Sequence, residues 1–172
     1  MQASLSNLEQ NRNTKGLCVP YDPLNPDAQA ICRGVLRLFE GLGSVGLSEV
    51  TLPNRRRVDV MALGGQGEIS VVEIKSSVND FRTDGKWEEY LPYCDHFYFA
   101  VSQAFPQHLI PDEVGLIVAD GFGGAVLRDA PYSKLSGARR KALTLRYARL
   151  AATRLMSANP AQTSLLGLDE EM

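Results

Sequence analysis

Apolar residues recur at helical spacing from Ile31 to Phe39, which predicts an amphipathic helix near the start of the folded region. The Asn-Pro-Asp sequence at positions 25–27 is a typical helix start, with Asn as the capping residue. Its aspartate would lie near the positive end of the helix dipole. Gly41 and Gly43 are expected to end the helix.

Three strand-like segments follow this helix, at Val45–Leu52, Arg57–Leu63 and Glu68–Lys75. The second has Val58, Val60 and Ala62 on one face, and the third is rich in β-branched residues, which favour strands. The glycine-rich segment Gly64–Gly67 between them suits a tight hairpin turn.

The second half of the chain continues to mix both patterns. A short helix is expected at Asp84–Leu91, and Pro92 should end it. The further predicted elements are strands His96–Val101, Val114–Ala119 and Ala125–Arg128 and a last helix from about Ser136 to Met156. The order α-β-β-β-α-β, followed by a hairpin and a helix, predicts an α/β fold with a mixed central sheet and flanking helices.

Composition fits one domain with short tails. The chain has 172 residues, of which 44% are hydrophobic. We expect a flexible arm at 1–20, a folded domain at 21–157 and a flexible tail at 158–172. The absence of a long apolar run argues against a membrane span, and the polar N-terminal stretch argues against a secretory signal. Three widely spaced cysteines suggest reduced thiols, so a cytoplasmic location is expected.

Two neighbouring strands carry charge where apolar residues are expected. Glu73 and Lys75 are two residues apart and therefore point to one face of their strand. Hairpin pairing could bring Asp59 close to Glu73, and two half-buried carboxylates repel unless a cation lies between them. Mg²⁺ or Mn²⁺ would suit such oxygen ligands, and the backbone carbonyl of Ile74 could add another.

Lys75 has a clear role beside such a cation. Its ammonium group could orient or help to deprotonate an attacking water and stabilise charge that develops on a phosphate. The alternative is that Glu73 and Lys75 form a solvated strand end and Asp59 an ordinary salt-bridge partner, because charges are common at strand ends.

The surrounding sequence favours the chemical interpretation. The pattern VDV, followed thirteen residues later by EIK, resembles the PD-(D/E)xK nuclease superfamily. The segments RRRVDVMAL and VEIKSSVNDFRTDGKWEEYLPYCDHFYFAV resemble more narrowly the MmcB-like DNA repair proteins, over roughly Ala28 to Leu155. The proline that often precedes the first acid of the superfamily is replaced by Val58.

The resemblance implies metal-dependent hydrolysis of DNA phosphodiester bonds, with Asp59 and Glu73 as metal ligands and Lys75 as the catalytic lysine. Some superfamily members add an acid from the first helix, and Glu40 is the matching candidate. A non-catalytic DNA-binding or recruitment module remains the alternative function. An RNA nuclease is a further alternative, because nothing in the sequence tests for the 2′-hydroxyl.

Net charge is −2, so contact with a nucleic acid must come from local basic patches. Six cations and no acid lie between positions 139 and 154 in the last helix, and a run of arginines precedes Asp59. A solvated charged face is the alternative for each patch. The residues predicted to contact DNA are Arg55, Arg56, Ser77, Lys86, Tyr90, Arg139, Arg140 and Lys141.

The C-terminal tail contains a possible partner peptide. Gln162 is followed by the adjacent leucines Leu165 and Leu166, in a pattern that resembles the short peptides with which bacterial repair proteins bind the sliding clamp. Because such short patterns also occur by chance, a tail without this partner is the alternative.

Overall fold

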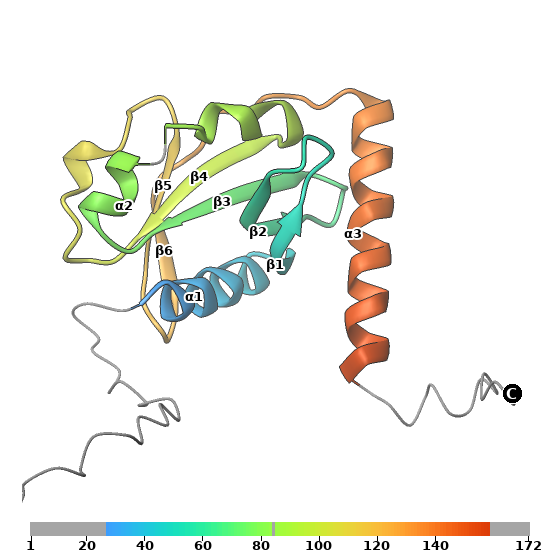
Figure 1. Cartoon of the computed structure of the whole chain (residues 1–172), viewed down its shortest axis with the longest axis horizontal. Helices are drawn as coiled ribbons and strands as arrows, with labels where there is room; N and C mark the ends of the chain where they lie inside the picture. Colours follow the sequence, from blue (N-terminus) through green and yellow to red (C-terminus); the bar gives the residue numbers. More distant parts are fainter. Residues whose placement is uncertain (1–26, 84, 159–172) are drawn as a thin grey trace, which may run out of the picture.

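The computed structural model describes residues 27–83 and 85–158 (Figure 1). Helix α1 (Ala28–Gly41) begins at Asp27, whose side chain accepts a hydrogen bond of 2.7 Å from the backbone N–H of Ala30. The cap is therefore Asp27 and not the predicted Asn25, which lies outside the described residues. Gly43 follows the helix with φ of +77°, a conformation that favours glycine.

The strands form one mixed sheet in the order β1-β2-β3-β4-β5-β6. Strands β1 to β3 pair antiparallel, β3 to β5 pair parallel, and β6 returns antiparallel to β5. This arrangement confirms the predicted α/β class and most of the predicted strands. The strand bounds are β1 (Val45–Thr51), β2 (Arg57–Leu63), β3 (Ile69–Lys75), β4 (His96–Val101), β5 (Gly115–Ala119) and β6 (Gly124–Arg128).

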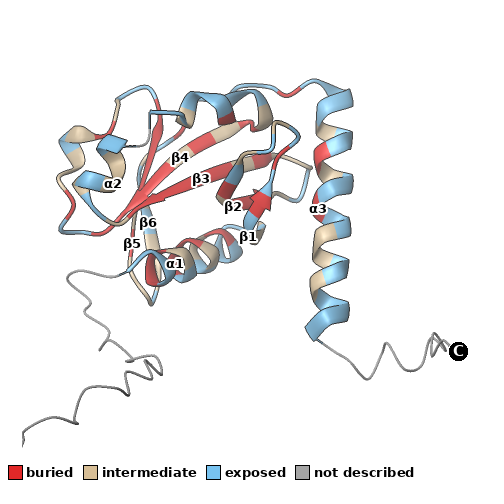
Figure 2. Ribbon diagram, viewed as in Figure 1, coloured by how far each residue is buried: buried red, intermediate tan, exposed pale blue. Residues whose placement is uncertain are grey.

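The two faces of the sheet are covered by different elements. On one face, α1 packs through Ile31 and Val35 on a core that includes Val60 and Val72. The larger core on the other face includes Phe97 and Phe99 of β4 and extends to side chains of the later helices. Figure 2 shows the resulting burial of β3 and β4 along most of their length.

Helix α1 also makes a close approach to the loop between β5 and β6. A Cβ atom at Gly34 would overlap the backbone carbonyl oxygens of Asp120 and Gly123. One turn further along, the Arg37 side chain donates hydrogen bonds to the carbonyls of Gly121 and Phe122. These contacts hold α1 firmly against the sheet.

The prediction of one helix at Asp84–Leu91 is wrong. The segment instead forms a short helix α2 (Val78–Thr83) and, further on, a 3₁₀ helix η1 (Trp87–Tyr93). Helix α2 begins before the predicted position because Ser77 caps it: the Oγ of Ser77 accepts a hydrogen bond of 3.1 Å from the N–H of Asp80. A second 3₁₀ turn, η2 (Gln107–Leu109), follows β4.

Helix α3 (Gly137–Ala158) stands beside β1 at the edge of the sheet (Figure 1). Its side chains donate hydrogen bonds to outward carbonyls of β1: Tyr147 Oη to Val45 at 2.7 Å, Arg146 to Thr51 at 2.9 Å and Arg154 to Glu49 at 3.3 Å. An unpaired strand edge is a template for association with another chain. We call this set of contacts the α3 strap, because it occupies that edge.

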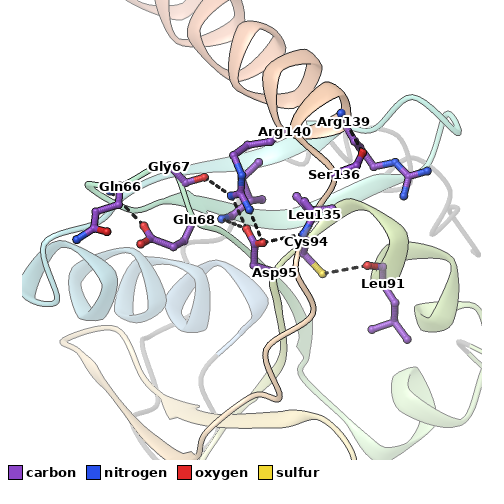
Figure 3. A network of polar contacts seen from close by, with 11 residues as sticks. Gln66, Gly67, Glu68, Leu91, Cys94, Asp95, Leu135, Ser136, Arg139 and Arg140 are labelled. Atoms are coloured by element: carbon purple, nitrogen blue, oxygen red, sulfur yellow. Dashed lines mark hydrogen bonds and ion pairs between the residues drawn. The ribbon is translucent and has the colours of Figure 1, made fainter.

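Asp95, at the start of β4, joins four segments of the chain (Figure 3). Its carboxylate accepts hydrogen bonds from the N–H groups of Ile69 and Leu135, at 2.8 and 3.1 Å. Arg140 of α3 donates to both carboxylate oxygens at 2.7 Å and also to the carbonyl of Gly67. Asp95 is 1% exposed, so this ion pair lies within the folded domain.

None of the helices in residues 27–83 and 85–158 combines the length and apolar character that a bilayer crossing needs.

Candidate functional site

The candidate site lies where strands β2 and β3 separate. Their backbone pairing extends from Leu63↔Ile69 to Val60↔Val72, and no pair is formed beyond that point. Beyond it, the side chain of Asp59 bridges the two strands, because its Oδ2 accepts a hydrogen bond of 2.7 Å from the N–H of Ile74. The carboxylate is thereby held between the two strands by a backbone group.

Glu73 and Lys75 follow on β3, and both are buried, at 5% and 4% exposure. Nζ of Lys75 lies 3.7 Å from Oε2 of Glu73. Together with Asp59 and Ile74, they line a single cleft of about 710 Å³. The structure thus brings together the four residues for which the sequence predicted a common site, and the buried positions of Glu73 and Lys75 do not fit a solvated strand end.

The electrostatics of the cleft centre on Asp59. Burial raises the pKa of its carboxyl group, and the nearby Asp80 adds to the shift. The hydrogen bond from Ile74 and the charges of Lys75 and Arg57 act in the opposite direction but do not cancel it. Burial, Asp59 and Glu49 likewise raise the pKa of the neighbouring Cys32 thiol. The field in the cleft therefore favours protonated acids, or an added cation.

Sequence reasoning missed three charged residues that line the cleft: Arg33, Glu49 and Asp80. The pairs Ser48↔Val60 and Val50↔Val58 flank Glu49 and Asp59 in the β1–β2 register, and Glu49 has φ of +51°, which is unusual for a residue other than glycine. Its carboxylate lies 3.3 Å from Arg57 at the surface. Register alignment of β1 with β2 is the signal that would have placed Glu49 beside Asp59. No spacing rule indicated Arg33.

Glu40 is not among the residues that line the cleft. It is exposed in the last turn of α1, whereas the residues of α1 that line the cleft lie between Ala28 and Leu36. The cleft geometry therefore gives no support to Glu40 as a metal ligand, and that role stays a prediction. An acid at position 40 faces solvent because the first half of the helix, and not its end, borders the separating strands.

The residues predicted to contact DNA around η1 have other environments. Tyr90 is buried, and its ring stacks on Phe97 with 6.2 Å between centroids. Lys86 precedes η1 and is exposed, so the shared helical face predicted for Lys86 and Tyr90 is wrong. In a 3₁₀ helix, side chains three residues apart align, not those four apart. Ser77 is exposed, and its hydroxyl caps α2.

The predicted basic patches are largely engaged within the protein. Arg56 forms an ion pair with Glu89 at 2.7 Å, while Arg55 is exposed with φ of +69°. Arg139 donates to the carbonyl of Pro92 and lies over the Tyr93 ring.

Figure 3 shows Arg140 directed toward Asp95, so the structure gives Arg140 an internal partner, and its contact with DNA stays a prediction. Lys141 is exposed and keeps its predicted role as a hypothesis. The predicted partner peptide, Gln162, Leu165 and Leu166, lies outside the described residues, as do most of the predicted arm and tail.

Comparison with known proteins assigns a family to this fold and cleft. Residues 22–162 match the family described as DNA repair protein MmcB-like. The chain belongs to this MmcB-like family. This match confirms the MmcB-like resemblance predicted from the segments around Asp59 and Lys75. The placement in the PD-(D/E)xK superfamily is compatible with the match but stays a prediction. Comparison with curated proteins gave no match.

A solved structure similar to this MmcB-like chain is described as the SPO1766 protein of unknown function from Silicibacter pomeroyi. The two share 40% sequence identity, with a TM-score of 0.76, and the similarity covers 88% of this chain and 100% of the other. The likeness supports the mixed sheet with flanking helices and adds no function.

The donor atoms of the cleft are suited to a small divalent cation. Within residues 27–83 and 85–158, no three His, Cys, Asp or Glu side chains form a metal-binding group. Mg²⁺, however, is usually bound by one or two carboxylates and keeps several waters. Asp59 and Glu73 supply two carboxylates in one cleft, which Ile74 also lines. This donor set therefore fits Mg²⁺ or Mn²⁺.

Proposed function

We propose that this MmcB-like protein is a metal-dependent nuclease that hydrolyses DNA phosphodiester bonds during repair. The observation that carries the proposal is the position of Asp59, Glu73 and Lys75 in one cleft at the separation of β2 and β3. The family's description as DNA repair proteins supports DNA as the substrate. A buried glutamate and lysine beside a half-buried aspartate have no packing advantage over apolar residues, so a chemical role accounts for them better.

Each residue has a distinct part in the proposed reaction. Asp59 and Glu73 would hold Mg²⁺ or Mn²⁺, which, when bound, offsets the negative charge of a phosphodiester and makes a water more acidic. Lys75, held beside Glu73, keeps an ammonium group at the cleft. That group can orient the attacking water by hydrogen bonding and stabilise charge on the phosphate as the P–O bond breaks.

The non-catalytic alternative has lost part of its support. It relied on the basic face of α3 as a DNA-binding surface, yet Arg139, Arg140, Arg146 and Arg154 all donate hydrogen bonds to the protein itself. Contact between DNA and α3 would have to use the remaining cations, such as Lys141. The sliding clamp stays a hypothetical partner through Gln162, Leu165 and Leu166.

A cleavage assay tests the proposal. End-labelled single-stranded, duplex and branched DNA, with a matched RNA, would be incubated with the full chain in Mg²⁺, Mn²⁺ or EDTA. We expect metal-dependent cleavage of DNA that falls at least about 100-fold in the Asp59→Asn variant, because the ligand charge is lost. The substituted amide oxygen can still accept the Ile74 hydrogen bond, so the fold should persist.

Controls separate chemistry from folding and from contamination. Lys134→Ala, purified in the same way, removes an exposed charge from the segment between β6 and α3 and should cleave like the wild type. Lys75→Ala should also be inactive, but it leaves Glu73 buried without its nearby ammonium, so its unfolding must be measured in parallel. Cleavage by Asp59→Asn at the wild-type rate, or no cleavage of any substrate by the wild type, would refute the nuclease proposal.

A further inference from the structure

The charged side chains of the cleft are mostly acidic. Four of its lining residues are acids, and two are cations: the acids are Glu49, Asp59, Glu73 and Asp80, and the cations are Lys75 and Arg33. Lys75 is 4% exposed and lies beside Glu73 in the interior of the cleft. An approaching nucleic-acid backbone would meet repulsion here unless an accessible cation receives it. Arg33 is the cleft residue that meets this description.

Arg33 differs from most of the arginines that the structure describes. Its side chain is exposed on α1 and makes no hydrogen bond or ion pair with any residue in 27–83 or 85–158. Arg37, one turn further on the same helix, is engaged by the loop carbonyls of Gly121 and Phe122. Internal partners are also present for Arg56, Arg57, Arg128, Arg139, Arg140, Arg146 and Arg154.

The backbone that carries Arg33 is held in place. Ile31 and Val35, two residues before and two residues after Arg33 in the helix, are fully buried against the sheet. Gly34 lies against the β5–β6 loop so closely that no side chain fits there. Arg33 therefore extends from a rigid platform, and only its own rotamers must be ordered when a ligand binds.

We infer that Arg33 is a substrate-binding residue that takes a phosphate of the nucleic-acid backbone on the α1 side of the cleft. A guanidinium presents paired N–H donors that match two phosphate oxygens, with more geometric specificity than an ammonium group. Bound in this way, the backbone would be positioned with its next phosphodiester toward Asp59 and Lys75. The inference rests on the proposed function, because it assigns that same cleft a substrate with a sugar–phosphate backbone.

Binding is measured separately from cleavage, in the full chain carrying Asp59→Asn and in EDTA. Fluorescence anisotropy with labelled single-stranded and duplex oligonucleotides gives the dissociation constant over a series of salt concentrations. Arg33→Ala should weaken binding about tenfold and reduce the salt slope by about one phosphate contact. Arg33→Lys should recover the salt slope but only part of the affinity, because it keeps the charge and loses the paired donors.

Lys134→Ala is the matched control. It removes the same charge from an exposed residue of the loop before α3. That loop lies away from the cleft, because the N–H of the adjacent Ser133 donates a hydrogen bond to the carbonyl of Asp95 at the start of β4. This variant should bind like the parent, and thermal unfolding of all three variants should match that of the parent. In the cleavage-competent chain, Arg33→Ala should raise KM more than it lowers kcat.

The outcomes distinguish the two proposals. Binding that depends on Arg33, in a protein that cleaves nothing, would sustain the inference and refute the nuclease proposal. If the wild type cleaves DNA with metal and Arg33→Ala matches it in affinity, salt slope and KM, the nuclease proposal stands and the inference about Arg33 is refuted. The inference is also overturned if Lys134→Ala loses as much affinity as Arg33→Ala, or if the parent chain binds no oligonucleotide.

Discussion

Replacing Arg140 with alanine tests whether this arginine supports the fold or faces a ligand. The guanidinium donates to both oxygens of Asp95 at 2.7 Å, and Asp95 is 1% exposed. Its loss would leave a buried carboxylate with backbone donors alone, at Ile69 and Leu135. Breaking a buried pair in this way costs about 3–5 kcal/mol. Because the Arg140 side chain is 25% exposed, water can take over part of its hydrogen bonding in the variant. We therefore expect the free energy of unfolding to fall by about 3 kcal/mol.

Urea unfolding followed by fluorescence gives the free energy of unfolding directly. The chain has one tryptophan, Trp87, whose ring stacks on Phe97 in the core at 5.6 Å and should report loss of packing. Lys141→Ala is the control: the residue is adjacent on α3 and exposed, so its loss should change stability by less than about 0.5 kcal/mol. We expect the melting temperature of Arg140→Ala to fall by on the order of 10 °C.

The pH dependence provides an independent check of the same pair. Burial alone would raise the pKa of Asp95, but hydrogen bonds from Arg140, Ile69 and Leu135 outweigh it and hold the pKa below its ordinary value. This stabilisation is complete above the unfolded-state pKa of about 3.9 and is lost as pH falls through the lower folded-state pKa.

Without Arg140 the burial effect dominates and the pKa of Asp95 should rise. The stability difference between wild type and variant should therefore be largest at neutral pH and shrink in acid. A neutral-pH difference below about 1 kcal/mol, or a gap that widens on acidification, would refute the assigned role.

Three further changes test the structure. Gly34→Ala should lower stability by about 1–3 kcal/mol in urea unfolding, because the new methyl group overlaps the backbone of Asp120; wild-type stability would show that α1 can move away from this loop. Tyr147→Phe removes the 2.7 Å hydrogen bond to Val45 and should cost about 0.5–1.5 kcal/mol by calorimetry; no loss would mean that water replaces this bond fully. Asp59→Asn should raise thermal stability in EDTA at neutral pH, because burial raises the pKa of Asp59 and its ionisation opposes folding. That gain should fade as pH falls below the raised pKa, and a less stable variant at neutral pH would contradict the explanation.

Local patterns were sufficient for the strands and for the core of the candidate site. Alternation and β-branched residues located β2 and β3, and the two-residue period placed Glu73 and Lys75 on one side of the same strand. The glycine-rich turn joins these strands in a register whose last pair, Val60↔Val72, directly adjoins Asp59 and Glu73. Each of these inferences depended on residues close together in the sequence.

The errors came from partners that sequence proximity does not reveal. The environment of Arg140 depends on Asp95, which lies 45 residues away in the chain. Tyr90 was assigned to an exposed helical face because the α-helical period was assumed where the chain forms a 3₁₀ helix. Arg33 was missed because its importance comes from the cleft beside it, and a helix pattern says nothing about which polar residues border a cleft.

The α3 strap has a consequence for the order in which the molecule is completed during synthesis. Among the strands that the structure describes, β1 is made first, yet its edge partners Arg146 and Arg154 follow their β1 acceptors by 95 and 105 residues. At about 5–20 residues per second, the outer carbonyls of β1 remain unoccupied for roughly 5–20 s after the strand is made. During that interval the nascent chain presents an open strand edge to its neighbours. A chain that ended before α3 would therefore keep an open edge at β1 to which other strands could pair, and α3 closes this edge late in synthesis.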